Sequence, residues 1–142
     1  MLVEKMPLKN LVCIRLNTGD DVLKSLTEAV KKQGIKNAII IAGTGSTTNH
    51  HFHLVASANV PPGNIMIKDD NKVSDILNIN GLVINGQVHA HITHSDRNVA
   101  YGGHLEEGVK VLTFMSITLA EIDFDLAHWD SFGRTIEEFR KK

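Results

Sequence analysis

The sequence predicts an α+β fold: a mainly antiparallel β-sheet covered by one principal helix, with a short helix at the C-terminus. Short segments rich in branched apolar residues recur along the 142 residues, and turns rather than crossover helices join most of them. Apolar residues make up 42% of the chain and charged residues 22%, values typical of a globular protein. No linker or internal repeat divides the chain, so we expect a single domain over residues 1–142.

The first strand is expected at residues 11–16, where branched residues are frequent. Thr18-Gly19-Asp20-Asp21 ends this strand and supplies an N-cap, with acidic residues in the first turn of a helix. The helix begins at Val22, and Gly34 fits its C-terminal cap. Its apolar positions recur at helical spacing: Val22, Leu23, Leu26, Ala29 and Val30. This helix is expected to cover one side of the sheet.

A second, continuously apolar strand is expected at residues 38–42. Gly43-Thr44-Gly45-Ser46 then predicts a flexible turn, after which a polar stretch leads to the apolar residues 54–56. The backbone N–H groups of Gly43, Gly45 and Ser46 are candidates for binding an anionic cofactor. However, the helix and the lysine of a phosphate-binding loop are missing, so a plain tight turn is the favoured interpretation.

The second half of the chain predicts strands and turns up to the closing helix. Pro61-Pro62-Gly63-Asn64 marks a surface loop. Strands are expected at 76–84, with a bulge at Gly81, and at 109–122, the longest apolar segment. Between them lies a hairpin with strands at 88–93 and 99–101 and its turn at 95–98, and residues 131–142 favour the short closing helix.

The hairpin carries the main functional candidate, because His89 and His91 point to the same face of its first strand. If Asp96 and Arg97 are the central turn residues, His89 lies opposite His104, and three imidazoles converge. Three neutral imidazoles plus a water are a standard catalytic arrangement for zinc. Imidazole also suits nickel, copper and iron, so the site is predicted more firmly than its metal. A His-x-His pair on an exposed strand is also commonly a polar surface, and that alternative stays open.

Four other histidines, His50, His51, His53 and His94, have different expected roles. His51 and His53 share a strand face with His50 on the other, and surface or pocket-lining roles are favoured over a second metal site. His94 falls on the face opposite His89 and His91 and is expected near the turn, at the surface.

Four further residues are candidates for acid–base work or for substrate anchoring. Glu106 and Glu107 follow His104 directly, and Glu121 lies in the long strand. A carboxylate beside a metal can activate its water or orient an imidazole, although paired glutamates in a turn are usually only solvated. Arg15 can anchor a substrate carboxylate, although an ion pair is the more common use of such an arginine.

Composition argues against several functions. The net charge of −1 and the pI of about 6.7 differ from the basic character of domains that bind DNA through its phosphates, so direct nucleic-acid binding is not expected. No apolar segment is long enough to span a membrane, and the cytoplasm is the expected location. The single cysteine, Cys13, lies in an apolar run and is expected to be a small buried hydrophobe.

The sequence also resembles a known family. The segment from Gly86 to Asp96, continued by Gly102-Gly103-His104-Leu105, resembles the PPC (plants and prokaryotes conserved) domain, and further landmarks run from about Leu11 to Ile122. The resemblance implies an α+β domain assembled as a homotrimer. Plant relatives add AT-hook motifs, but this chain lacks their Arg-Gly-Arg core. Stand-alone prokaryotic members keep elements that match His89, His91 and His104, and acetolactate decarboxylase has a similar fold with three metal-binding histidines.

Two hypotheses follow. The first is a metal-dependent lyase or hydrolase, with zinc as the expected metal, that acts on a small oxygen-rich substrate. The second is a non-catalytic regulatory or DNA-associated ligand-binding module. The sequence leaves open whether the protein is an enzyme.

Overall fold

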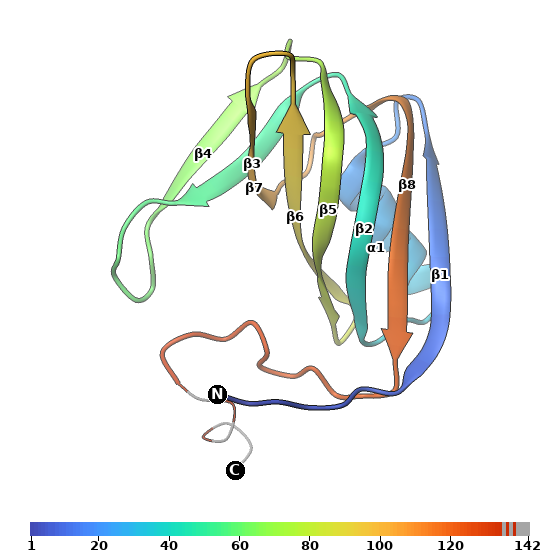
Figure 1. Cartoon of the computed structure of the whole chain (residues 1–142), viewed down its shortest axis with the longest axis vertical. Helices are drawn as coiled ribbons and strands as arrows, with labels where there is room; N and C mark the ends of the chain where they lie inside the picture. Colours follow the sequence, from blue (N-terminus) through green and yellow to red (C-terminus); the bar gives the residue numbers. More distant parts are fainter. Residues whose placement is uncertain (135, 137, 139–142) are drawn as a thin grey trace.

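The computed structural model describes residues 1–134, 136 and 138, and within them the chain forms one eight-stranded sheet and one helix, α1 (Val22–Lys32) (Figure 1). The strand order is β1-β8-β2-β5-β6-β7-β3-β4, and all neighbouring strands are antiparallel. The α+β fold with one covering helix is therefore confirmed. The strands are β1 (Leu8–Asn17), β2 (Ala38–Thr47), β3 (His50–Val55), β4 (Asn64–Asp69), β5 (Ser74–Ile84), β6 (Gln87–Ser95), β7 (Ala100–Leu105) and β8 (Val111–Ile122).

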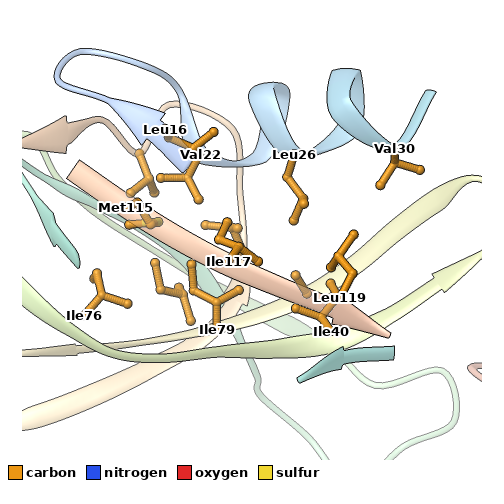
Figure 2. Packing of buried hydrophobic residues seen from close by; sticks show 14 of the residues in the cluster. Leu16, Val22, Leu26, Val30, Ile40, Ile76, Ile79, Met115, Ile117 and Leu119 are labelled. Atoms are coloured by element: carbon orange, nitrogen blue, oxygen red, sulfur yellow. The ribbon is translucent and has the colours of Figure 1, made fainter. Parts of the chain in front are cut away.

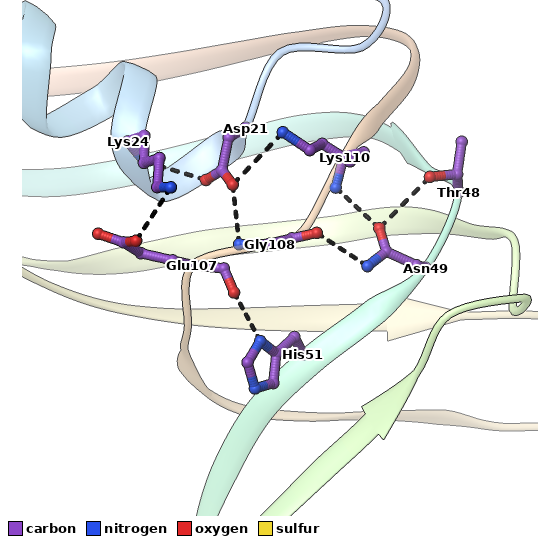
Figure 3. A network of polar contacts seen from close by, with 8 residues as sticks. All are labelled: Asp21, Lys24, Thr48, Asn49, His51, Glu107, Gly108 and Lys110. Atoms are coloured by element: carbon purple, nitrogen blue, oxygen red, sulfur yellow. Dashed lines mark hydrogen bonds and ion pairs between the residues drawn. The ribbon is translucent and has the colours of Figure 1, made fainter.

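Helix α1 begins where the sequence predicts. The Asp21 carboxylate accepts a hydrogen bond from the Lys24 amide at 3.2 Å and so caps the first turn. The same carboxylate accepts from the Gly108 amide at 2.8 Å, which ties the helix to the loop between β7 and β8 (Figure 3). No helix in the described part of the chain is long and apolar enough to cross a membrane.

The hydrophobic core lies between α1 and one face of the sheet (Figure 2). Val22, Leu26 and Val30 form the buried stripe of the helix, and they pack over inward-facing residues of β8 such as Met115 and Ile117. Burying each such side chain contributes about 1.5–3 kcal/mol. Because strand side chains alternate, the residues between these buried positions face away from the helix.

Strand β2 differs from the expectation, because it continues through the predicted turn at residues 43–46. A Cβ at Gly43 would lie 2.7 Å from the Ile79 Cβ of β5, and a Cβ at Gly45 would collide with the Phe114 carbonyl of β8. The glycines therefore allow three strands to pack closely and do not make a turn. Gly43, Gly45 and Ser46 lie within this strand and do not form the turn whose backbone N–H groups were expected to bind an anion.

Three other expectations also need correction or fall outside the described residues. Strand β4 was missed, because its apolar run is short and forms an exposed sheet edge next to β3. Cys13 is exposed rather than buried, since it faces away from the helix on the edge strand β1. Of the closing helix expected at residues 131–142, residues 131–134 are not helical, and 135, 137 and 139–142 fall outside the described residues.

Candidate metal centre

The β6–β7 hairpin has a longer turn than the sequence analysis assumed. Ser95 pairs with Ala100, and the Asp96 carboxylate accepts hydrogen bonds from the Asn98 and Val99 amides at 2.8 and 3.1 Å. His91, and not His89, therefore lies opposite His104. The predicted register is wrong by two residues, but a shift of two leaves every side chain on its original face.

The three histidines lie together on the sheet face opposite α1. Their ring centroids are separated by 4.9 Å (His89–His104), 5.6 Å (His91–His104) and 5.7 Å (His89–His91). With Zn–N bonds of 2.0–2.1 Å, each ring centroid lies about 3.2 Å from a tetrahedral ion, so the centroids lie about 5.2 Å from one another. The observed separations bracket this value, so the three rings are close enough to share one ion once their nitrogens turn toward it.

Strand β3 adds a fourth histidine that sequence reasoning did not assign to the cluster. His53 pairs with His104 across the β3–β7 ladder, and their rings stack with centroids 4.4 Å apart and planes 19° from parallel. His53, His104 and Glu106 form a second set, and among the described residues it is this set whose potential ligand atoms all lie within 4.8 Å of one another. The two possible sets of ligands share His104.

Two carboxylates contact the Nδ1 atoms of the cluster. Glu106 Oε1 accepts a hydrogen bond from His53 Nδ1 at 2.6 Å and lies 3.6 Å from His104 Nδ1, which is buried and has no hydrogen-bond partner among the described residues. Asp130 Oδ2, from the segment after β8, lies 3.3 Å from His89 Nδ1. A metal-binding imidazole usually donates its other N–H to such a carboxylate. Glu106 and Asp130 are therefore placed to orient His104 and His89 with Nε2 free for a metal.

The electrostatic surroundings favour the neutral imidazoles that bind metals. Desolvation, followed by the nearby imidazoles of His89 and His53, lowers the pKa of His91, although part of that side chain faces solvent. Burial lowers the pKa of His104, and the imidazoles of His53 and His89 lower it further. Since only the neutral form has a lone pair to give to a metal, both shifts make the site ready to bind at neutral pH.

The histidines form one side of a cavity of about 640 Å³. Gly102 and Gly103 of β7 also line it, but their main role is in strand packing. A Cβ at Gly103 would collide with the His53 carbonyl and lie 2.9 Å from the Phe52 ring, so β7 approaches its neighbours closely only because it carries glycine there. The opposite side of the cavity consists mainly of apolar side chains: Leu54, Val55, Pro61, Pro62 and Phe132.

Of the four residues considered for acid–base or anchoring roles, only Glu106 reaches the histidines. The Glu107 side chain instead turns toward Lys24 of α1, 3.2 Å away (Figure 3). Glu121 accepts hydrogen bonds from Lys9 at 3.0 Å and from Asn10 at 2.7 Å, between β8 and β1.

Arg15 and the glycine segment also lie outside the cluster. Arg15 is on β1, at the edge of the sheet remote from β7, and its guanidinium group donates to Asn17 and lies over the Phe114 ring. Gly43, Gly45 and Ser46 lie within β2, between β8 and β5. None of these residues lines the histidine cavity.

The remaining histidines of β3 and β6 differ in burial. His51 is half-buried and contacts the Glu107 carbonyl (Figure 3). His50 and His94 are buried on the helix side, so the surface position expected for His94 is wrong. The Ser74 hydroxyl lies 2.9 Å from both His50 Nε2 and His94 Nδ1 and connects the two rings. Burial, followed by the neighbouring His50, lowers the pKa of His94 to about 3.

Solved structures with the same fold come from bacteria and archaea. A metal-containing protein from Archaeoglobus fulgidus matches with a TM-score of 0.75 and 19% identity, over 88% of each chain. A plant- and prokaryote-conserved (PPC) protein from Pyrococcus horikoshii matches with a TM-score of 0.72 and 21% identity, over 88% of this chain and 87% of that one. A provisionally named DNA-binding protein from Bacteroides thetaiotaomicron matches with a TM-score of 0.69 and 19% identity, over 84% of this chain and 86% of that one.

Comparison at the level of sequence gives the family directly. No curated protein matches the chain significantly. The family model of the Plants and Prokaryotes Conserved (PCC) domain, however, matches residues 4–123, which is most of the chain. The protein therefore belongs to the Plants and Prokaryotes Conserved domain family, as the histidine and glycine motifs of its β6–β7 hairpin had suggested.

Proposed function

We propose that the protein binds one divalent metal ion through His89, His91 and His104, and that this ion is zinc. The observation that carries the proposal is the separation of the three ring centroids, 4.9 to 5.7 Å, which matches three ligands of one tetrahedral ion. A related fold from Archaeoglobus fulgidus is named as a metal-containing protein, which supports a metal here. Three protein ligands leave a fourth position for water or substrate.

The arrangement suits a lyase or hydrolase that acts on a small oxygen-bearing substrate. When bound, the metal polarises a carbonyl or carboxylate oxygen or lowers the pKa of a water. Asp130 contacts His89 Nδ1 at 3.3 Å, and Glu106 lies 3.6 Å from His104 Nδ1, close enough to accept a hydrogen bond from it after a small shift, so the two carboxylates would orient these imidazoles toward a metal. The cavity of about 640 Å³ leaves room for a small molecule beside them.

We also propose that the chain forms one domain over residues 1–142 and works as a cytoplasmic homotrimer. Four adjacent strands expose large apolar side chains to solvent: Leu11 on β1, Phe114 on β8, Ile41 on β2 and Leu77 on β5. Contact with other copies would cover them. Light scattering should give a mass of about three times the 15.6 kDa of one chain, and a mass of one chain would contradict the trimer.

Elemental analysis of protein without a histidine tag tests the metal proposal. We expect about one metal per chain in the wild type and less than about a tenth of that in the His89→Ala and His104→Ala variants. His51→Ala is the matched control, because His51 is a half-buried histidine of β3 outside the cavity lining, and it should keep its metal. If His53→Ala loses the metal while His89→Ala keeps it, the ion is held by the second set and the proposed ligands are wrong.

A second candidate function is a regulatory module that acts at DNA. The observation that favours it is that relatives from Bacteroides thetaiotaomicron and Ralstonia eutropha are provisionally named DNA-binding proteins. The net charge of −1 suggests that contact with DNA would be made through a partner. Fluorescence anisotropy with labelled duplex DNA over a range of salt concentrations tests this. Tight binding by the protein alone that weakens steeply with salt would show direct phosphate contacts instead.

A further inference from the structure

The histidine cavity has two sides of different chemistry. One side carries the imidazoles of β6 and β7, and the other is formed by the end of β3, the β3–β4 loop and the segment after β8. Leu54 and Val55 end β3, Pro61 and Pro62 lie in the loop, and Phe132 comes from the last segment. A ligand that fills the cavity must therefore combine a metal-binding group with an apolar part.

Several side chains of the apolar side are open to solvent. Val55 is 68% exposed, Phe132 is 63% exposed and Leu54 is 39% exposed. An aliphatic chain laid against them would remove their apolar surface from water, which favours binding in proportion to the area covered. The apolar side thus offers binding energy that a purely polar ligand cannot use.

The charges of the cavity restrict the polar end of the ligand. Asp130 is the only charged side chain among the described residues that line it, and none of these residues is lysine or arginine. A bound divalent ion would thus be the only cation that the described lining offers to an anionic ligand. Phosphate esters and other polyanions are usually bound by several cationic groups or by backbone N–H groups, whereas a single carboxylate needs only the metal.

We propose that the cavity binds a short-chain aliphatic carboxylate, with its carboxylate at the three histidines and its chain along Leu54, Val55 and Phe132. This inference rests on the proposed metal site and adds the class of ligand. It also explains why the segment after β8 contributes both a carboxylate that contacts His89 and an aromatic ring to the same cavity.

Calorimetry with zinc-loaded protein tests the inference, with acetate, butyrate and hexanoate as probes and inorganic phosphate as the comparison. Full burial of each added methylene should tighten binding about fourfold, so butyrate, with two more methylenes, should bind roughly 15 times more tightly than acetate. Phosphate should bind no more tightly than acetate. The apolar side should account for the gain: Phe132→Ala and Val55→Thr should each reduce the butyrate-to-acetate ratio severalfold and leave the metal content unchanged.

Ile65→Thr is the matched control. Ile65 is, like Val55, β-branched and exposed (53%), and it lies on β4 outside the cavity lining. The ratio of butyrate to acetate affinity of the Ile65→Thr variant should therefore equal that of the wild type. Equal affinities for acetate, butyrate and hexanoate in protein that carries its zinc would overturn the ligand class and leave the metal site intact. Protein that takes up no zinc would overturn the proposed function, and the ligand class with it.

Discussion

Replacing His94 by phenylalanine should change how the free energy of unfolding depends on pH, because this histidine of β6 is fully buried on the helix side of the sheet. Its exposed fraction is 0%, its Nδ1 lies 2.9 Å from the Ser74 hydroxyl, and no described residue forms a hydrogen bond with its Nε2. Phenylalanine has a similar shape and can keep the stacking with Phe52, whose ring centroid is 5.7 Å away. The Thr47 and Ser74 hydroxyls remain hydrogen-bonded to each other at 3.1 Å.

The size of the effect follows from the pKa of His94, which burial and the nearby His50 lower from 6.5 to about 3 in the folded protein. Below pH 6.5 the unfolded chain therefore binds a proton that the folded chain does not, and stability falls with falling pH until the folded pKa is reached. Each pH unit in this window costs about 1.4 kcal/mol, so at pH 5 the loss is about 2 kcal/mol relative to pH 8. His94→Phe removes this loss.

Urea unfolding at pH 8 and pH 5 measures the difference. At pH 8 the variant should be within about 1 kcal/mol of the wild type, because it loses hydrogen bonds but also loses an unpaired buried nitrogen. At pH 5 the variant should have gained about 2 kcal/mol relative to the wild type. His51→Phe controls for the loss of a histidine as such. If the free energies of unfolding of His94→Phe and wild type differ by the same amount at both pH values, the conclusion that His94 stays neutral in the folded protein is refuted.

Two further substitutions test the support of the metal site by Glu106 and the close packing of β7 at Gly103. Glu106→Gln should weaken zinc binding 10- to 100-fold, measured by competition with a chelator, because the carboxylate that faces His104 is lost; Glu107→Gln should not, since that side chain pairs with Lys24. Equal affinities in both variants would contradict the orienting role. Gly103→Ala should lower the free energy of unfolding by about 2 kcal/mol or more, because its Cβ would meet the backbone of β3. Gly63→Ala, where the nearest atom is 3.7 Å away, should be nearly neutral, and a similar loss in both would contradict the close packing of β7.

The parts of the structure that depend on nearby residues could be predicted from the sequence. Helix α1 begins at Val22 as expected, because its cap and its apolar spacing are both local signals. His89, His91 and His104 share a face even though the predicted turn was too short. Side chains alternate with a period of two, so an error of two residues in register left the cluster intact.

The parts that depend on distant strands could not be predicted. His53 joins the cluster only because β3 pairs with β7, and nothing near His53 in the sequence specifies that partner. Gly43 and Gly45 suggested a turn, since glycine marks both turns and close strand packing, and only the neighbouring β5 and β8 distinguish the two. Asp130 lies in a segment without periodicity, so no sequence signal placed it beside His89.

Anomalous diffraction from crystals of the zinc-loaded protein, recorded on both sides of the zinc absorption edge, tests the metal site most directly. We expect one zinc peak per chain, about 2.0–2.1 Å from a ring nitrogen of each of His89, His91 and His104, with a fourth position open to the cavity. A peak held by His53, His104 and Glu106, or no peak at full zinc saturation, would contradict it.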